Sequence, residues 1–278
     1  MKNIILCADD FSQNAAISQG IIQLIEHQRI NATSCMTNSA LWSTISHTLH
    51  ALHSQTFIGL HFNLTEGTPI SPQWKSQYGE QFFSLPELIR KSYVTGINPT
   101  VLRAELQAQW DAFRDGMNQE DPDFIDGHQH IHQLPSVANI LIDFCKAQRH
   151  WNGFVRQTYN GFKDWVSLQA FPKHQLLASL GGMRLKKLLS KNAMAYNSSF
   201  SGIIHFNDSQ LYSQIFPQFL QKITDNGLIM CHPGLNSKDS SDPLFKHRSF
   251  ELAYLLSDIF LQDLETYHVS LKSKSNNQ

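Results

Sequence analysis

Short apolar runs alternate with longer amphipathic segments along the whole chain. The apolar runs predict strands at Asn3–Ala8, Thr33–Thr37, Phe57–Phe62, Phe124–Gly127, Gly153–Arg156, Gly202–Phe206, Leu228–His232 and His268–Leu271. The segments between them predict helices at Asn14–His27, Leu41–His53, Pro99–Met117, Ser136–His150, Gln175–Leu189, Gln210–Asn226 and Phe250–Asp263. Regular alternation of strands and helices is typical of a mainly parallel α/β sheet, here with enough units to close as a (β/α) barrel.

The chain shows no linker rich in Gly, Pro or Ser and no internal repeat. Its 278 residues suit one barrel of roughly 250 residues, so we expect a single domain over 1–272 and a polar tail at 273–278. Two segments resemble insertions, Thr68–Ser84 and Tyr159–Asn197. The second contains the basic stretch MRLKKLLSK, for which a solvated helix face is favoured over a membrane or partner helix.

The charge balance excludes several classes of function. With 22 Lys+Arg against 23 Asp+Glu, the chain has no electrostatic footprint for nucleic acid. No apolar stretch approaches the roughly 20 residues that span a bilayer, and the N-terminal run reads as a strand, so we expect a cytoplasmic protein. The cysteines Cys7, Cys35, Cys145 and Cys231 form no CxxC pair, which predicts buried, reduced thiols.

Histidine is unusually frequent, with 14 residues, and several lie where a predicted strand ends. Catalytic sites of parallel α/β barrels are built on the loops at these carboxyl ends. The candidates are Asp9 and Asp10 after the first strand, His61 on the third, His128, His130 and His132 after the fourth, and His232 on a late strand. Their shared position, more than their number, predicts a common site.

Each of these motifs also has a purely structural interpretation. The aspartate pair can be a loop with a helix cap, His61 a hydrogen-bonded core residue, and His232 a cap before a Pro-Gly turn. The alternating histidines would share one face if their segment stayed extended, and three imidazoles on one face favour a divalent metal ion. With the ion on one aspartate, the other carboxylate would be free to act as a base.

The same motifs resemble those of the YdjC-like carbohydrate deacetylase family, which includes chitooligosaccharide deacetylases and hopanoid-pathway deacetylases. The matching segments are ADDF at Ala8–Phe11, INATSCMTNSA at Ile30–Ala40, GLHFNLTEGTP at Gly59–Pro69, DGHQHIH at Asp126–His132 and MCHPG at Met230–Gly234. The resemblance implies a metal-dependent deacetylase on a (β/α) barrel related to polysaccharide deacetylases, often with an incomplete or distorted barrel.

The resemblance also implies roles for individual residues. Asp10, His61 and His128 would bind one divalent ion, Asp9 would be the general base and His232 the general acid. One departure is Ser12, which stands where the family usually has glycine. Because glycine reaches positive φ at little cost, we expect the loop to follow a different path here.

Other residues are candidates for substrate contact or for orienting the ligands. These are His130, His132, Asn63, Thr65 and Arg156. Trp74 and Tyr78 could stack on a sugar ring or act as packing anchors. The expected cofactor is one divalent ion, Mg²⁺ by the resemblance or Zn²⁺ by the softness of two imidazole ligands.

We therefore expect a hydrolase that removes N-acetyl groups from an acetylated carbohydrate, such as an N-acetylglucosamine-containing oligosaccharide or glycoconjugate. The alternatives are a metal-dependent phosphoesterase or amidohydrolase on a barrel, or a sugar-binding module without catalysis. The retained Asp9 argues against the inactive module, and a two-metal site would favour the phosphoesterase. The expected partner is a small acetylated sugar, and a homodimer is compatible with the sequence.

Overall fold

The computed structural model describes residues 1–160, 181–204, 211–237, 242 and 244–274. Its strands form one sheet in the order β6-β5-β4-β3-β2-β1-β8-β7, with β9 also paired to β1. The strands are β1 Lys2–Phe11, β2 Ala32–Cys35, β3 Phe57–Phe62, β4 Phe124–Gly127, β5 Phe154–Val155, β6 Ala195–Tyr196, β7 Phe200–Ser201, β8 Leu228–Cys231 and β9 Val269–Leu271. The pairings along this path are parallel, as the alternation of elements predicts.

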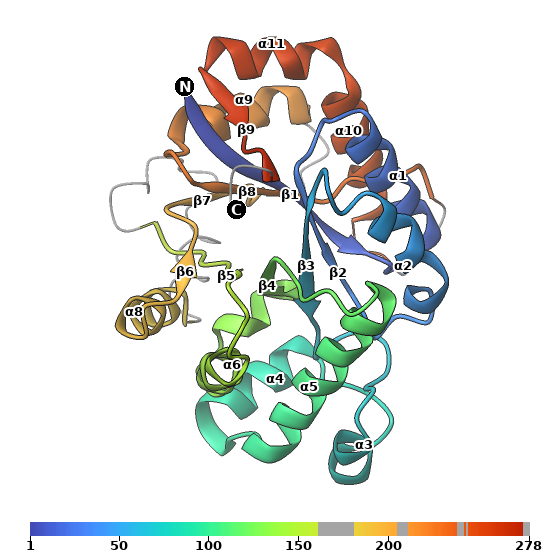
Figure 1. The fold of residues 1–278 in the computed structure, drawn as a ribbon, viewed down its shortest axis with the longest axis vertical. Helices are drawn as coiled ribbons and strands as arrows, with labels where there is room; N and C mark the ends of the chain where they lie inside the picture. The colour runs from blue at the N-terminus through green and yellow to red at the C-terminus, as the bar shows by residue number, and fades with distance from the viewer. Residues whose placement is uncertain (161–180, 205–210, 238–241, 243, 275–278) are drawn as a thin grey trace.

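Helices surround the curved sheet, with α1 and α2 on one side and α8 on the opposite side (Figure 1). They are α1 Ala15–Glu26, α2 Trp42–Ala51, α3 Pro72–Tyr78, α4 Leu85–Arg90, the π-helix η1 Lys91–Thr95, α5 Pro99–Gly116, the 3₁₀ helix η2 His128–Gln133, α6 Pro135–Ala147, α8 Met183–Lys191, α9 Tyr212–Lys222, α10 Phe245–Leu256 and α11 Asp258–Thr266. Helix α1 illustrates the pattern, because Asn14 caps it and Ile17, Ile21 and Leu24 face the sheet.

The sheet does not close through backbone pairing between β6 and β7 in the described part of the chain. Asparagine side chains beside this gap link the segment after β5 to Asn197, which follows β6, and to β7. Asn197 Oδ1 accepts from the Gln157 backbone N–H at 2.8 Å, and its Nδ2 donates to the carbonyls of Gln157 and Ser199. Asn160 pairs in the same way with the backbone N–H and C=O of Phe200. The expectation of an incomplete barrel is therefore confirmed.

The interior of the barrel is filled with apolar side chains. They include Ile5, Phe57, Phe124, Phe200 and Leu228. Gly59 makes room for one of these rings, since a Cβ there would lie only 2.4 Å from the ring of Phe124. This packed layer supports the carboxyl ends of the strands, where the polar candidates lie.

Some predicted element boundaries were wrong. The predicted strand Gly202–Phe206 is coil up to Ile204, because the strand lies earlier at β7, and its last residues fall outside the described residues. The predicted helix Phe250–Asp263 is two helices. Ser257 interrupts them with extended backbone (φ −77°, ψ 161°), and its hydroxyl accepts from Phe260 N–H to cap α11.

The two apparent insertions contain helices. Within Thr68–Ser84, α3 buries Trp74 completely against Tyr78 and two phenylalanines. For the predicted helix Gln175–Leu189, residues 175–180 lie outside the described residues, and α8 covers its C-terminal part. Leu185 and Leu189 of α8 are buried while Lys187 and Lys191 are exposed, so the predicted solvated face is confirmed. Lys186 is half-buried and donates to the Tyr159 carbonyl at 3.2 Å.

Two further expectations can be compared with the structure. Cys7, Cys35, Cys145 and Cys231 are all buried and free of disulfides, which confirms their prediction as reduced core thiols. Across the described residues, no helix has the length and apolar character needed to cross a membrane.

Candidate metal and catalytic centre

An irregularity in β1 positions both aspartates. The strand continues to Phe11 instead of ending at Ala8, but its register with β2 shifts between Ala8 and Phe11. Asp10 lies within this shift at a φ of 70°, a backbone conformation that non-glycine residues rarely adopt. Such bulges re-aim side chains beside active sites. The distortion lets the neighbouring residues Asp9 and Asp10 both line one cavity.

Asp10, His61 and His128 meet at the carboxyl ends of β1, β3 and β4, as the sequence predicts. Asp10 Oδ1 lies 3.4 Å from His61 Nε2 and 3.0 Å from His128 Nδ1. Two ligands each about 2.0–2.2 Å from one ion lie about 3.0–3.5 Å apart. The three atoms therefore match the spacing that a divalent ion requires, and the three residues are all buried.

Burial and the neighbouring carboxylates have opposing effects on the pKa values of the two imidazoles. Burial alone would lower the pKa of His61, but Asp126 and the contact with Asp10 raise it to about 10. For His128, burial is likewise outweighed by Asp10 and Glu66, which raise the pKa to about 9. Without a metal ion these carboxylates hold protons on the rings. A cation at the same place would take over that charge pairing, because metal ligation needs neutral imidazole.

Asp126 orients His61 from behind. Its Oδ1 lies 2.6 Å from His61 Nδ1, which leaves Nε2 directed at Asp10. A carboxylate behind a metal-bound imidazole is the usual arrangement, because it fixes the tautomer and the ring orientation. Ser34 Oγ also lies 3.0 Å from the same His61 nitrogen. The sequence motif contained Asp126, but nothing in the sequence indicated that it would face His61.

Asp9 is held by Arg156. The guanidinium donates from Nη1 to Oδ2 at 2.6 Å and from Nη2 to Oδ1 at 2.7 Å, and it also forms an ion pair with Asp126 at 2.6 Å. Burial would raise the pKa of Asp9, but Arg156 holds it well below its ordinary value. Arg156 is fully buried and does not line the cavity, so it supports the site and does not face the substrate.

Arg156 also occupies a second cluster of ligand-type side chains. Cys7, Asp9 and Asp126 offer three such atoms within 4.8 Å of one another. The guanidinium touches all three, since its Nη2 also lies 3.1 Å from Cys7 Sγ. The chain's own cation therefore fills the place where a second metal ion would otherwise sit.

The three alternating histidines do not share one face. The segment turns as η2, in which Gln129 and His130 adopt positive φ values of 51° and 58°. The extended geometry considered for them is therefore wrong. His128 joins Asp10, His130 lines the cavity, and His132 Nε2 lies 2.9 Å from the carbonyl of Arg156 inside the fold.

His130 and His132 stay neutral. Burial is the main cause that lowers the pKa of each ring to about 3. The Nδ1 atom of His130 has no hydrogen-bond partner in the described part of the chain. The His130 residue lines the cavity, but this nitrogen is itself buried.

His232 follows β8 and lines the same cavity of about 230 Å³. Burial lowers its pKa, and the nearby Asp10 and Asp9 carboxylates oppose the shift. The backbone N–H of His232 donates at 2.7 Å to Glu251 of α10. Burial raises the pKa of Glu251 to about 7. Because β8 pairs with β1 and Cys231 lies opposite Ala8, His232 lines the cavity beside the aspartates, with its backbone N–H held by Glu251.

The candidates Asn63 and Thr65 stabilise a loop and do not form part of the cavity wall. Both amide atoms of Asn63 are used within its own turn, where Oδ1 accepts from the N–H groups of Thr65 and Glu66. Neither Asn63 nor Thr65 lines the cavity. Trp74 is buried in an aromatic cluster with Tyr78, so the sugar-stacking interpretation is wrong and the packing one is confirmed.

The prediction of an altered loop at Ser12 is also wrong. Ser12 adopts the positive φ, 71°, that a glycine would favour. Its hydroxyl donates to the Met36 carbonyl at 2.7 Å, and its N–H donates to Ser18 Oγ at 3.0 Å. These two bonds help to offset the cost of the backbone conformation.

Two residues of the site carried no recognisable signal in the sequence. Glu66 Oε1 lies 3.0 Å from His128 Nε2, and Arg248 Nη2 donates to Asp10 Oδ2 at 2.9 Å. Glu66 was part of a matched motif without a role, and Arg248 lies on α10, far from any motif. Only the tertiary fold places them beside the ligands.

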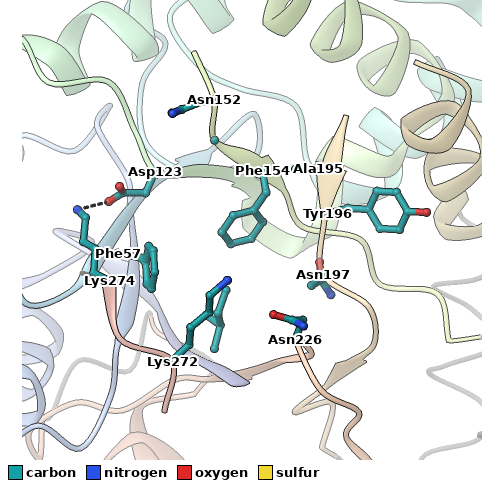
Figure 2. Close-up of a pocket in the computed structure, with 12 residues that line it drawn as sticks. Phe57, Asp123, Asn152, Phe154, Ala195, Tyr196, Asn197, Asn226, Lys272 and Lys274 are labelled. Carbon is teal, nitrogen blue, oxygen red and sulfur yellow. Dashed lines mark hydrogen bonds and ion pairs between the residues drawn. The ribbon is translucent and has the colours of Figure 1, made fainter. Parts of the chain in front are cut away.

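A larger cavity, of about 480 Å³, lies at the opposite end of the strands (Figure 2). Phe57 and Phe154 form part of its wall, and Lys274 pairs there with Asp123 at 2.7 Å. Its position at the amino ends of the strands is the stabilising face of parallel barrels. The cavity with the converging carboxylates and imidazoles is the stronger candidate for chemistry.

The fold and the site define an incompletely closed parallel α/β barrel with a buried Asp-His-His cluster at the carboxyl ends of its strands. The profile of the YdjC-like protein family matches residues 3–266, and the chain belongs to this family. A crystal structure from Enterococcus faecalis V583, of a candidate cellobiose-phosphate cleavage protein, is similar with a TM-score of 0.73 at 18% identity. That similarity covers 99% of this chain and 98% of that one, and it supports the fold.

Curated relatives carry deacetylase names. A human carbohydrate deacetylase is 30% identical over 149 residues, which cover 52% of this chain and 45% of the human protein. The match to this relative therefore spans only about half of either chain. A chitooligosaccharide deacetylase from Yersinia enterocolitica is 25% identical across 99% of both chains. A carbohydrate deacetylase from Clostridium beijerinckii is 24% identical, covering 96% of this chain and 97% of the other.

Proposed function

We propose that this protein is a metal-dependent hydrolase that removes an N-acetyl group from an acetylated carbohydrate. The observation that carries the proposal is the convergence of Asp10, His61 and His128 beside Asp9 and His232 in one cavity. The full-length relatives named carbohydrate and chitooligosaccharide deacetylase support the reaction and the substrate class. An N-acetylglucosamine-containing oligosaccharide or glycoconjugate is the proposed substrate.

Asp10, His61 and His128 would hold one divalent ion, Zn²⁺ or Mg²⁺. A bound divalent ion acidifies water and polarises a carbonyl oxygen, which are two requirements of amide hydrolysis. Three protein ligands with further positions open are characteristic of catalytic sites. The ring nitrogens suit Zn²⁺, and the carboxylate suits either ion.

In this mechanism Asp9 accepts a proton from the attacking water. Water adds its oxygen to the acetyl carbon, the carbon–nitrogen bond breaks, and the products are acetate and a sugar amine. The low pKa of Asp9 keeps the carboxylate ionised, and Arg156 fixes its orientation. The Arg156 contacts also make Asp9 a weaker base, so its role depends on prior acidification of the water.

His232 delivers the proton to the departing nitrogen. It lines the cavity on the β8 side, opposite the β3 and β4 residues, and its lowered pKa makes the imidazolium a strong proton donor once formed. His130 lines the cavity and is a candidate contact for the sugar. His132 supports the Arg156 backbone from inside the fold.

The test is acetate release. Protein stripped with a chelator and reloaded with Zn²⁺ or Mg²⁺ is incubated with N-acetylated chitooligosaccharides, and acetate is quantified. Activity that requires metal, and that D9N and H232A each reduce at least 100-fold with the metal content retained, is the expected result. The absence of acetate with every N-acetylated sugar tested would reject the proposed reaction.

A two-metal phosphoesterase is the main rival. Arg156 argues against it, because the guanidinium fills the only other ligand cluster found among the described residues. One ion per chain in elemental analysis is therefore expected. Two ions per chain, together with phosphate release from phosphorylated sugars, would favour the rival.

A further inference from the structure

Each of the three metal-ligand candidates has one charged partner on the side away from the shared centre. Asp126 takes this position behind His61 Nδ1. Arg248 takes it behind Asp10, where Nη2 donates to Oδ2 and leaves Oδ1 facing the histidines. For His128 the partner is Glu66, whose Oε1 lies 3.0 Å from Nε2 while Nδ1 faces Asp10.

Glu66 is itself tied to the partner of Asp10. Gln13 Nε2 donates to Glu66 Oε2 at 2.7 Å, and Gln13 Oε1 accepts from Arg248 Nη2 at 3.0 Å. Together with the contacts of Asp10 to Arg248 and to His128, and of His128 to Glu66, these two bonds close a ring of polar contacts. Its members are Asp10, His128, Glu66, Gln13 and Arg248. The ring joins residues that follow β1, β3 and β4 to helix α10, so it connects segments far apart in the sequence.

Hydrogen bonds from the side chain of Asn63 hold the Glu66 backbone in place. Asn63 Oδ1 accepts from Glu66 N–H at 3.1 Å, and Asn63 Nδ2 donates to Glu66 C=O at 2.6 Å. The Glu66 side chain remains 33% exposed, while His128 is almost fully buried. Glu66 therefore approaches His128 from the solvent side as part of the cavity wall, with little backbone entropy left to lose.

We infer that Glu66 is a positioning residue that holds the His128 ring, through the polar ring, with Nδ1 turned toward the metal. The inference rests on the metal centre of the proposed function. A carboxylate behind a metal-bound imidazole fixes its tautomer and raises its basicity. In the present structure Glu66 and His128 form an ion pair. With Nδ1 on the metal, Nε2 would keep its proton and its close charge contact with Glu66.

Cobalt is a suitable probe because Co²⁺ binding can be followed by visible absorption without any substrate. Metal-free wild type, E66A, E66Q and Q13A are titrated with Co²⁺, with E80A as the matched control. Glu80 is an exposed carboxylate, and its ion pair with Lys75 is 3.7 Å long. Circular dichroism checks that each variant is folded.

Removal of an outer partner typically costs about 10–100-fold in metal affinity, and this loss is expected for E66A together with an altered cobalt spectrum. E66Q keeps an oxygen that can accept from Nε2–H, so its loss should be smaller. Q13A should lie between E66Q and wild type, and E80A should match wild type. Because E66Q preserves the shape of the residue, its cobalt affinity and spectrum can still be compared with those of the wild type if E66A unfolds.

Wild-type affinity and spectrum in both E66A and E66Q would overturn the inference while leaving the metal centre intact. A loss of acetate release in E66A with unchanged cobalt binding would also overturn it, because Glu66 would then act on the substrate. Failure of the wild type to bind cobalt would reject the metal centre itself, and the inference with it.

Discussion

The rings of His61 and His128 stand nearly perpendicular, with centroids 5.4 Å apart and planes at 73°. They present opposite nitrogens to Asp10, Nε2 from His61 and Nδ1 from His128. The difference follows from their origins, since His61 projects from β3 and His128 begins the η2 turn. Each ring therefore has its remaining nitrogen free for a separate carboxylate, Asp126 or Glu66.

This arrangement predicts that metal binding releases protons. Without metal, the pKa of His61 is about 10 and that of His128 about 9, so both rings are charged at pH 7.5. Ligation needs the ring nitrogen free of its proton, so about two protons should leave per Zn²⁺ bound. Calorimetric titration in two buffers of different ionisation enthalpy measures this number. Release of less than about half a proton would contradict the assigned protonation states.

Arg156 should be essential for stability. Removing one member of a buried ion pair strands the other, at a cost of about 3–5 kcal/mol. R156A would leave Asp9 and Asp126 without their cation, so its free energy of unfolding should fall by that order. R114A is the control, because Arg114 pairs with Asp121 at 39% side-chain exposure and should change stability by less than about 1 kcal/mol. Urea denaturation measures both, and equal losses would refute the prediction.

Glu251 should make stability depend on pH. Burial raises its pKa from 4.5 to about 7, so the folded state binds this proton more tightly than the unfolded state. The resulting stabilisation is complete below about pH 4.5 and is lost as pH rises through 7. A shift of this size corresponds to about 3 kcal/mol.

E251Q isolates this contribution, because the glutamine keeps an oxygen for the His232 N–H and has no proton to lose. Between pH 5 and 8.5, the wild type should lose stability relative to E251Q, as measured by chemical denaturation at each pH. Parallel pH profiles for the two proteins would show that Glu251 titrates normally.

Ser12 provides a paired comparison of backbone strain and hydrogen bonding. S12A keeps the strained φ and removes the hydroxyl donor to the Met36 carbonyl, which still accepts from Ser39 N–H, so the lost bond costs about 1 kcal/mol. S12G loses the same bond but relieves about 1 kcal/mol of strain. We expect S12G to be the more stable variant by that difference in denaturant midpoints. The reverse order would mean that the positive φ of residue 12 costs alanine nothing that glycine can relieve.

Much of the site could be predicted because its residues follow apolar runs that form strands. Asp10, His61 and His128 each lie at the end of such a run, and parallel strands bring their carboxyl ends together. The conformation of the turns between these runs could not be predicted in this way. Nothing in the alternation of the histidines indicates the left-handed Gln129 and His130 that separate them.

The side chains that contact the candidate metal ligands and Asp9 could not be predicted from the sequence either. Arg156 was a candidate for substrate contact, yet it points into the fold, because it pairs with two buried carboxylates, Asp126 on the neighbouring strand β4 and Asp9 on β1. Arg248 reaches Asp10 from a helix more than two hundred residues later in the chain. Such contacts depend on how the helices close around the sheet, which the periodicity of one segment does not encode.

The gap between β6 and β7 separates the closure of the barrel wall from the site. Elsewhere along the sheet the wall is held by backbone pairing. Beside the gap, single side chains make the links, because Asn160 pairs with the backbone of Phe200 in β7 and Asn197 pairs with that of Gln157 after β5. In the described part of the chain, closure on this side therefore depends on two asparagines, whereas Asp10, His61 and His128 stand on or directly after strands that backbone pairing already aligns.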